Sequence, residues 1–214
     1  MTLKMFLRYC VPWKSAPASI DLREGDVIFV QAFGRNTFSE SSVFAVGVMS
    51  GEISDDERTL EWLESHNFDP GIPNKKLAQR TRELMEKYEI PAIVQWEVAA
   101  AFEKRWYLQN KKRIICIWPP EERNAYFDTT KVKMRSLEYA KEYGWESPIE
   151  VAHAMQITRA ALIIEKLSGK FPLIPNSLPD DFDKKSVQWW TRNIWVWLAR
   201  ESLGRIHHLI TGRV

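Results

Sequence analysis

Residues 91–119 read PAIVQWEVAAAFEKRWYLQNKKRIICIWP, and the fold prediction rests on this stretch. Two short apolar runs, residues 91–96 and 113–119, flank a helical pattern over residues 97–110. Short apolar strands that alternate with helices are typical of right-handed βαβ units, in which the strands are parallel. The stretch therefore predicts a parallel sheet with helices on both faces.

The same alternation continues on both sides of this stretch. It predicts an α/β Rossmann-like three-layer sandwich, with a mostly parallel sheet of about five strands and a long C-terminal helix. One domain is expected over residues 1–214, with an N-terminal extension over 1–25 and a C-terminal helical segment over 183–214. Further strands are expected at residues 26–32, 147–153 and 170–175, and helices at 74–89, 131–144 and 155–169, with a short one from Thr59. Asn74 is expected as an N-cap, and Gly144 as a helix end.

Composition favours a globular protein and argues against a nucleic-acid partner. Of 214 residues, 45% are hydrophobic, and 30 Lys and Arg against 28 Asp and Glu give a net charge of +2, whereas a phosphate backbone calls for a concentrated basic surface. Cys10 and Cys116 lie far apart, which favours free thiols and a reducing compartment. No secretory signal and no membrane span are expected, so the cytoplasm is the predicted location. No histidine or cysteine spacing suggests a metal site.

Ligands of open parallel sheets bind beyond the carboxyl ends of the strands, so the strand exits supply the candidate residues. The first exit holds Gly34, Arg35 and Asn36, which could line an anion site, and an ordinary polar loop is the alternative. No glycine-rich phosphate loop is present. The second exit holds Gln95 and Glu97. An amide at the end of a buried strand must find partners, whereas the helix dipole alone favours a glutamate at a helix start.

The third and fourth exits add Thr130 and His153. Asp128, Thr129 and Thr130 precede a helix and could present hydroxyl and amide groups to a ligand, although one of them is needed only as a cap. His153 could transfer protons near neutral pH, and a hydrogen-bonded structural histidine is the commoner alternative.

Gln156 and Arg159 lie three residues apart and share one face of the helix after the fourth strand. Arg159 falls in the first helical turn, where the dipole disfavours a cation. We therefore expect an anion opposite Arg159, either a ligand or a protein carboxylate such as Glu97. A ligand would leave the fold of Arg159→Ala intact, whereas a structural ion pair would make that variant less stable.

Four tryptophans, Trp189, Trp190, Trp195 and Trp197, mark the C-terminal segment. The helical pattern there is apolar around most of its circumference, which predicts burial in the core or in a homodimer interface. Trp190 and Trp197 in particular are expected to be largely buried. A membrane-surface helix would call for a cleaner polar face rich in lysine.

Three segments resemble the YdcF-like family of Rossmann-like proteins, which includes SanA-like and ElyC-like members. They are LAQRTRELMEKYEIPAIVQWE at residues 77–97, the stretch from residue 128 to 169, and ARESLGRIHHLITG at residues 199–212. Arg80, Thr130 and Arg159 match the motifs of the family. The glycine-rich first loop of the family is reduced to Gly34, and Gln156 stands where its histidine is usual. The resemblance implies a Rossmann-like fold and S-adenosylmethionine as the candidate cofactor.

These observations predict a cytoplasmic protein that binds a small nucleotide-like or anionic ligand at the strand ends. An enzyme of this kind would be a transferase or hydrolase acting on a small phosphorylated or nucleotide-like substrate, with Glu97 and His153 as the catalytic acid and base. The expected ligand-binding residues are Gly34, Arg35, Asn36, Arg80, Gln95, Thr130, Gln156 and Arg159. The alternative is a non-catalytic sensor or assembly factor that acts through its Trp-rich C-terminal helix.

Overall fold

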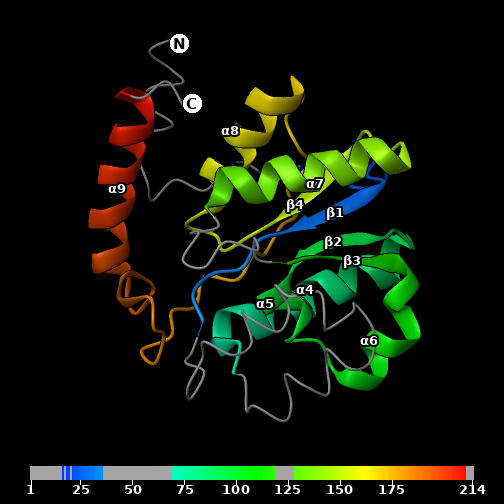
Figure 1. The fold of residues 1–214 in the computed structure, drawn as a ribbon, viewed down its shortest axis with the longest axis horizontal. Helices are drawn as coiled ribbons and strands as arrows, with labels where there is room; N and C mark the ends of the chain where they lie inside the picture. Colours follow the sequence, from blue (N-terminus) through cyan, green and yellow to red (C-terminus); the bar gives the residue numbers. More distant parts are fainter. Residues whose placement is uncertain (1–15, 17, 20, 36–68, 119–127, 211–214) are drawn as a thin grey trace.

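The computed structural model describes residues 16, 18–19, 21–35, 69–118 and 128–210, with the backbone alone for residues 205–210 (Figure 1). The predictions for Cys10, Asn36 and the helix from Thr59 lie outside these residues.

The sheet is parallel throughout and has four strands in the order β3-β2-β1-β4. Phe29 of the central strand pairs with Ile93 on one side and with Glu150 on the other. Nearly every strand residue is buried, as expected for a parallel sheet covered on both faces. The strands are β1 (Val27–Val30), β2 (Ala92–Gln95), β3 (Ile114–Ile117) and β4 (Pro148–Val151), which confirms the four strand predictions that surround them.

The prediction of a fifth strand at residues 170–175 is wrong. Leu173 makes a single parallel bridge with Ile149, in which its N–H donates to Pro148 O at 2.9 Å. Pro172 and Pro175 flank this bridge and have no N–H to donate, so the ladder does not extend.

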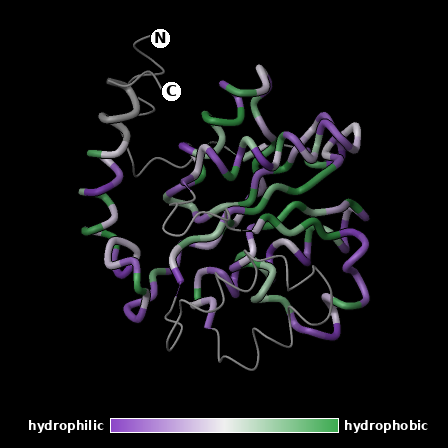
Figure 2. Tube along the Cα trace, in the orientation of Figure 1, coloured by the Kyte–Doolittle hydropathy of each residue, from purple (hydrophilic) through white to green (hydrophobic). Residues whose placement is uncertain are grey.

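Helices cover both faces of the sheet, which makes the fold Rossmann-like (Figure 1). One core cluster joins Ile28 and Val30 of β1 to the helices that follow β1 and β2, and a second joins Val27 and Phe29 to the helices that follow β3 and β4. Figure 2 shows apolar residues concentrated along the strands. The helices are α4 (Gly71–Tyr88), α5 (Trp96–Ala99) and α6 (Lys104–Asn110) on one face, α7 (Thr129–Tyr143) and α8 (Ile157–Ser168) on the other, and α9 (Ile194–Ile210) at one side. Two 3₁₀ turns are η1 (Lys111–Arg113) and η2 (Trp189–Thr191).

Three predictions of helix boundaries are wrong: the single helix over 97–110, the start of α4 and the start of α9. The helix predicted over 97–110 is divided into α5 and α6, because Ala101 and Phe102 donate to carbonyls three residues back and this tighter turn ends α5. Asn74 is not an N-cap, since α4 already begins at Gly71. Gly144 does end α7, with φ +75°.

The C-terminal helix begins at Ile194 rather than near Asp183. Asp183 is held outside a helix because its carboxylate accepts hydrogen bonds from Ile72 N and Lys185 N. Trp197 is buried as predicted, and Trp190 only in part. Among the described helices none combines the length and the apolar character needed to cross a bilayer.

Candidate functional site

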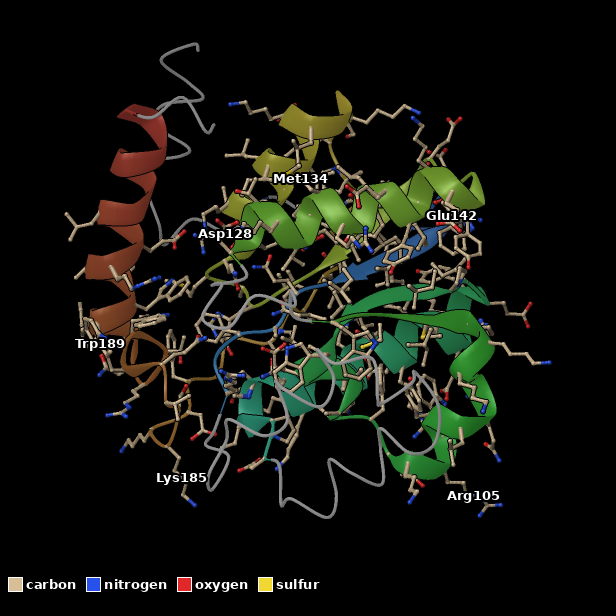
Figure 3. All side chains as sticks on the ribbon, viewed as in Figure 1. Arg105, Asp128, Met134, Glu142, Lys185 and Trp189 are labelled. Carbon is tan, nitrogen blue, oxygen red and sulfur yellow. The ribbon has the colours of Figure 1, made fainter. Side chains whose placement is uncertain are left out.

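The strand order reverses between β1 and β4, which places a topological switch point at the carboxyl ends of these two strands. Helices that follow the strands start at the same edge, so α7 and α8 bring their first residues to it. Figure 3 shows Asp128, which caps α7, at the end of that helix that lies toward α9.

Three buried side chains meet at this point, and we call them the amide cluster: Gln31, Thr129 and Gln156. The amide nitrogen of Gln31 donates to the hydroxyl oxygen of Thr129 at 2.8 Å, and that of Gln156 reaches the same oxygen at 3.4 Å. Within the described parts of the chain, the amide oxygens of Gln31 and Gln156 are buried and have no partner. Turning either amide round would exchange an unmet oxygen for an unmet nitrogen. The cluster therefore has hydrogen-bonding capacity that the described chain leaves unused.

We call a second group the carboxyl cluster. It consists of Gln95, the last residue of β2, Trp96 and Glu97, which follow β2, and Arg35 from the chain after β1. The guanidinium of Arg35 lies 5.5 Å from the centre of the Trp96 ring. Burial raises the pKa of Glu97 to about 7, although the charge of Arg35 and a hydrogen bond from Gln95 act in the opposite direction. One carboxylate oxygen of Glu97, Oε2, is buried and meets no partner among the residues that the structure describes.

The two clusters are neighbours because β1 and β2 are neighbours. Ala32, which follows Gln31, donates its N–H to the amide oxygen of Gln95 at 3.1 Å. Among the described residues, the carboxyl edge of the sheet thus holds three unmet oxygens: Gln31 Oε1 after β1, Glu97 Oε2 after β2 and Gln156 Oε1 after β4. Buried polar atoms are nearly always paired, so three exceptions in adjacent groups are unusual.

A buried ion pair lies one turn further along α7. Lys133 binds Glu150 of β4, and both side chains are fully buried. Burial lowers the pKa of Lys133 and raises that of Glu150 to about 7, while the attraction between them opposes both shifts. Lys133 lies four residues after Thr129, so the ion pair and the amide cluster lie on the same face of α7.

The other side of the β1 exit is filled with rings, and we call it the aromatic region: Phe33, His153, Phe182 and Trp197. Phe33 stacks on His153 with ring centres 3.6 Å apart and meets the edges of Phe182 and Trp197. His153 Nε2 is 3.0 Å from Asp181 O, and Nδ1 accepts from Met155 N at 3.3 Å. Burial lowers the pKa of His153 to about 4, so it is neutral at pH 7. This geometry is that of a structural histidine, and neither ring nitrogen is left for catalysis.

Gly34 packs beneath the turn that precedes α9. Its φ is +67°, and a Cβ at this position would lie 2.5 Å from Thr191 Oγ1 and 2.9 Å from Ser186 Oγ. The next residue, Arg35, accepts hydrogen bonds at its carbonyl from Val187 N and Ser186 Oγ. Asn74 completes the clamp: it accepts from Phe33 N and donates to Gly34 O. The structure thus gives Gly34 a packing role.

The anion expected opposite Arg159 is a protein carboxylate, and it is Glu201 rather than Glu97. Arg159 Nε lies 3.1 Å from Glu201 Oε1, with the two side chains 12% and 1% exposed. The N-terminus of α4, where dinucleotide-binding folds hold phosphate, is occupied in the same way. Asp69 accepts from Gly71 N, and Asp183 accepts from Ile72 N.

Arg80 and Thr130 lie apart from both clusters. Arg80 binds Glu83 and the carbonyl of Asn176, which ties α4 to the segment after the Leu173 bridge. Thr130 lines a separate cavity of about 350 Å³ between the start of α7 and the end of α8. Its neighbour Thr129 takes the place in the amide cluster.

The structure therefore brings together Arg35, Gln95, Glu97 and Gln156 of the predicted residues. It adds Gln31 and Thr129, which the sequence indicated only by their places at a strand end and before a helix. No group of three or more His, Cys, Asp or Glu within the described parts of the chain could hold a metal ion.

No family model matches the chain, no curated protein matches it, and no solved structure matches it. The resemblance to the YdcF-like family stays a prediction.

Proposed function

We propose that the protein binds a nucleoside-like small molecule at the carboxyl edge of the sheet. The observation that carries the proposal is the set of three buried, unmet oxygens of Gln31, Gln156 and Glu97. Each unmet buried polar atom costs about 1–3 kcal/mol, which a ligand donor would recover on binding. Amino and hydroxyl groups of a nucleoside are donors of this kind.

The geometry favours a ligand without phosphate groups. Phosphate oxygens only accept hydrogen bonds when ionised. In the amide orientations of the structure, the unmet atoms of Gln31, Gln156 and Glu97 are acceptors as well, and no turn of an amide changes the carboxylate oxygen of Glu97. The two positions most suited to an anion, Arg159 and the N-terminus of α4, already bind carboxylates of the chain. Among nucleotide-like ligands, this supports an unphosphorylated nucleoside derivative over a nucleotide.

Glu97 has a place that suits a ribose. In dinucleotide-binding folds an acidic residue beyond the second strand accepts hydrogen bonds from the ribose hydroxyls. Glu97 lies two residues after the end of β2 and is buried beside Arg35. The resemblance to the YdcF-like family supports S-adenosylmethionine, a nucleoside that carries amino and hydroxyl donors. In a group-transfer reaction, Glu97 would be the proton-transfer residue, since its pKa is close to neutral.

Thermal shift and calorimetric titration with adenosine, S-adenosylmethionine, S-adenosylhomocysteine, ATP and inorganic phosphate test the proposal. At about 100 times its Kd, a ligand adds ~2.7 kcal/mol of stability. We expect stabilisation by the unphosphorylated nucleosides, and weaker binding in Gln31→Leu and Glu97→Gln. Glu138→Gln is the matched control, because Glu138 is an exposed residue of α7 paired with Arg135. Failure of every nucleoside, or binding that Gln31→Leu and Glu97→Gln leave unchanged, would overturn the proposal.

A further inference from the structure

The outer face of α9 and the turn before it expose an unusual amount of apolar surface. Trp195 is 78% exposed, Leu203 69% and Trp189 56%. Ten large apolar side chains are exposed in the described chain, and five of them lie between residues 187 and 203. Exposed apolar surface concentrated in this way marks an interaction site.

The exposed residues lie opposite the face by which α9 is attached. Trp197 and Glu201, four residues apart, are buried against the body of the protein. Trp195, Ala199 and Leu203 are also spaced by four residues and are all exposed, so they form a stripe on the other side of the helix. Figure 1 shows α9 along one side of the molecule, and Figure 3 shows Trp189 near its start. The stripe faces away from the sheet and is independent of the nucleoside site.

The charged residues from position 184 onward are basic, apart from Glu201. Lys184, Lys185 and Arg192 lie in the segment just before α9 and are exposed. Glu201 is the single acidic residue after position 183 in the sequence, and its carboxylate is buried against Arg159. Arg200 lies over the Trp190 ring at 4.0 Å, and its charge adds to the others. The solvent-facing charge of the segment is therefore positive.

The apolar stripe and the positive charge together favour an anionic bilayer over a second copy of this chain as the partner. A second copy of this chain would bring like charges together and offers no exposed acid on this segment to pair with them. An anionic bilayer surface suits both features, because tryptophan is favoured at the membrane interface and arginine and lysine bind anionic headgroups. α9 has no lysine-rich face of its own, and the lysines that a membrane-surface helix calls for come instead from the turn before it, at Lys184 and Lys185.

We propose that α9 is a membrane-surface helix whose outer face, with Trp189, Trp195 and Leu203, binds a bilayer rich in anionic lipid. The helix lies in the plane of the interface and does not cross the bilayer. Its inner face, through Trp197 and Glu201, keeps the α/β body attached to the surface.

Co-sedimentation of the full chain with vesicles tests this inference. We expect binding to phosphatidylglycerol vesicles that is at least about tenfold tighter than to phosphatidylcholine vesicles, that weakens with added salt, and that shifts tryptophan emission to the blue. Trp195→Ser combined with Leu203→Ser should reduce binding at least about tenfold with an unchanged Tm, since both side chains are exposed. Leu167→Ser combined with Phe171→Ser is the matched control, because these exposed apolar residues lie outside the segment.

Three outcomes would overturn the inference. The first is absence of binding, or equal binding to neutral and anionic vesicles. The second is a concentration-dependent dimer, seen by sedimentation velocity, that the Trp195 and Leu203 double variant abolishes, which would assign the stripe to a second copy. The third is tighter binding to a single-stranded oligonucleotide than to the anionic vesicles.

Discussion

The two sides of the β1 exit differ in the buried polar atoms that they leave unmet: oxygen acceptors on one side, and an indole N–H among packed rings on the other. Gln31 turns toward α7 and α8, whereas Phe33, two residues later, packs with rings near α4 and α9. Residues two apart in an extended strand share one face, so the two side chains separate because the chain has left β1 (Val27–Val30) before Gln31. The amide cluster around Gln31 keeps unmet oxygens. The aromatic region around Phe33 is filled with rings, its histidine has partners at both nitrogens, and its unmet buried atom among the described residues is a donor, the indole N–H of Trp197.

The C-terminal segment accounts for this difference. Glu201 pairs with Arg159, and Asp183 accepts from the start of α4, so the positions that attract anions are closed from within. No such contact from this segment reaches the oxygens of Gln31 and Glu97 among the described residues. The positive charge of Arg159 at a strand end thus marks where this chain docks on itself, whereas the proposed ligand would bind at the unmet oxygens of Gln31, Gln156 and Glu97.

Arg159→Ala should have the largest effect, on the closed side. It removes the cation beside the buried carboxylate of Glu201, and breaking a buried pair costs about 3–5 kcal/mol. Urea unfolding measures the loss, and Arg135→Ala, which breaks an exposed pair, should cost less than about 1 kcal/mol. A fully stable Arg159→Ala protein that binds inorganic phosphate less well than the wild type would restore the anion site that the sequence predicted.

Gly34→Ala should come next, with a loss of about 2–5 kcal/mol. The new Cβ meets Thr191 and Ser186 at contact distances that the packed turn cannot accept, and the left-handed backbone adds its own cost. Gly144→Ala separates the two effects, since φ is +75° there with no atom within 4 Å. Equal losses of unfolding free energy in the two variants would mean that the turn of residues 186–191 does not press on Gly34.

Glu97→Gln should stabilise the ligand-free protein in a pH-dependent way. The pKa of Glu97 is about 7 when folded against 4.5 when unfolded, so the wild type loses stability as pH rises from 4.5 through 7. Glutamine removes this loss, and its advantage should grow from near zero at pH 4 to at most about 3 kcal/mol at pH 8. Chemical denaturation at both pH values measures it. An advantage that does not change with pH would show that Glu97 is not held in a buried, unmet state.

Gln31→Leu should have the smallest effect on stability, within about 1 kcal/mol of the wild type. It removes one unmet oxygen along with the bond to Thr129, and Thr129 keeps Gln156 as a neighbour. A loss above about 2 kcal/mol in urea unfolding would mean that the amide cluster serves the fold rather than a ligand.

The four strands were predictable because each is a short apolar run between turn residues, and a strand of that kind is buried wherever it lies in a parallel sheet. The fifth run failed because two prolines remove donors that a ladder needs. Both the apolar runs and the two prolines are local features of the sequence, and the prolines decide where a run fails to form a strand.

The site was less predictable because its contacts are not local. Arg159 was rightly expected to face an anion, but no pattern indicates that Glu201, on another helix, supplies it. Thr130 was preferred to Thr129, and one residue of an α-helix is a rotation of about 100°, which separates the outer cavity from the amide cluster. The role of Gly34 depends on Thr191 and could not be inferred from its own surroundings in the sequence.

The contacts that residues 186–191 make with Gly34 and Arg35 can form only late in the synthesis of the segment between them. Arg35 and Ser186, which hydrogen-bond to each other, are 151 residues apart in the chain. At about 5–20 residues per second, the ribosome adds Ser186 roughly 8–30 s after Arg35. The turn that leaves the central strand therefore stays open until the 151 residues that follow Arg35, up to Ser186, have been added. Over that interval the ring of Phe33 and the neighbouring strand edges are exposed to other chains, so the synthesis of the segment around Ser186 determines when they are covered and protected from aggregation.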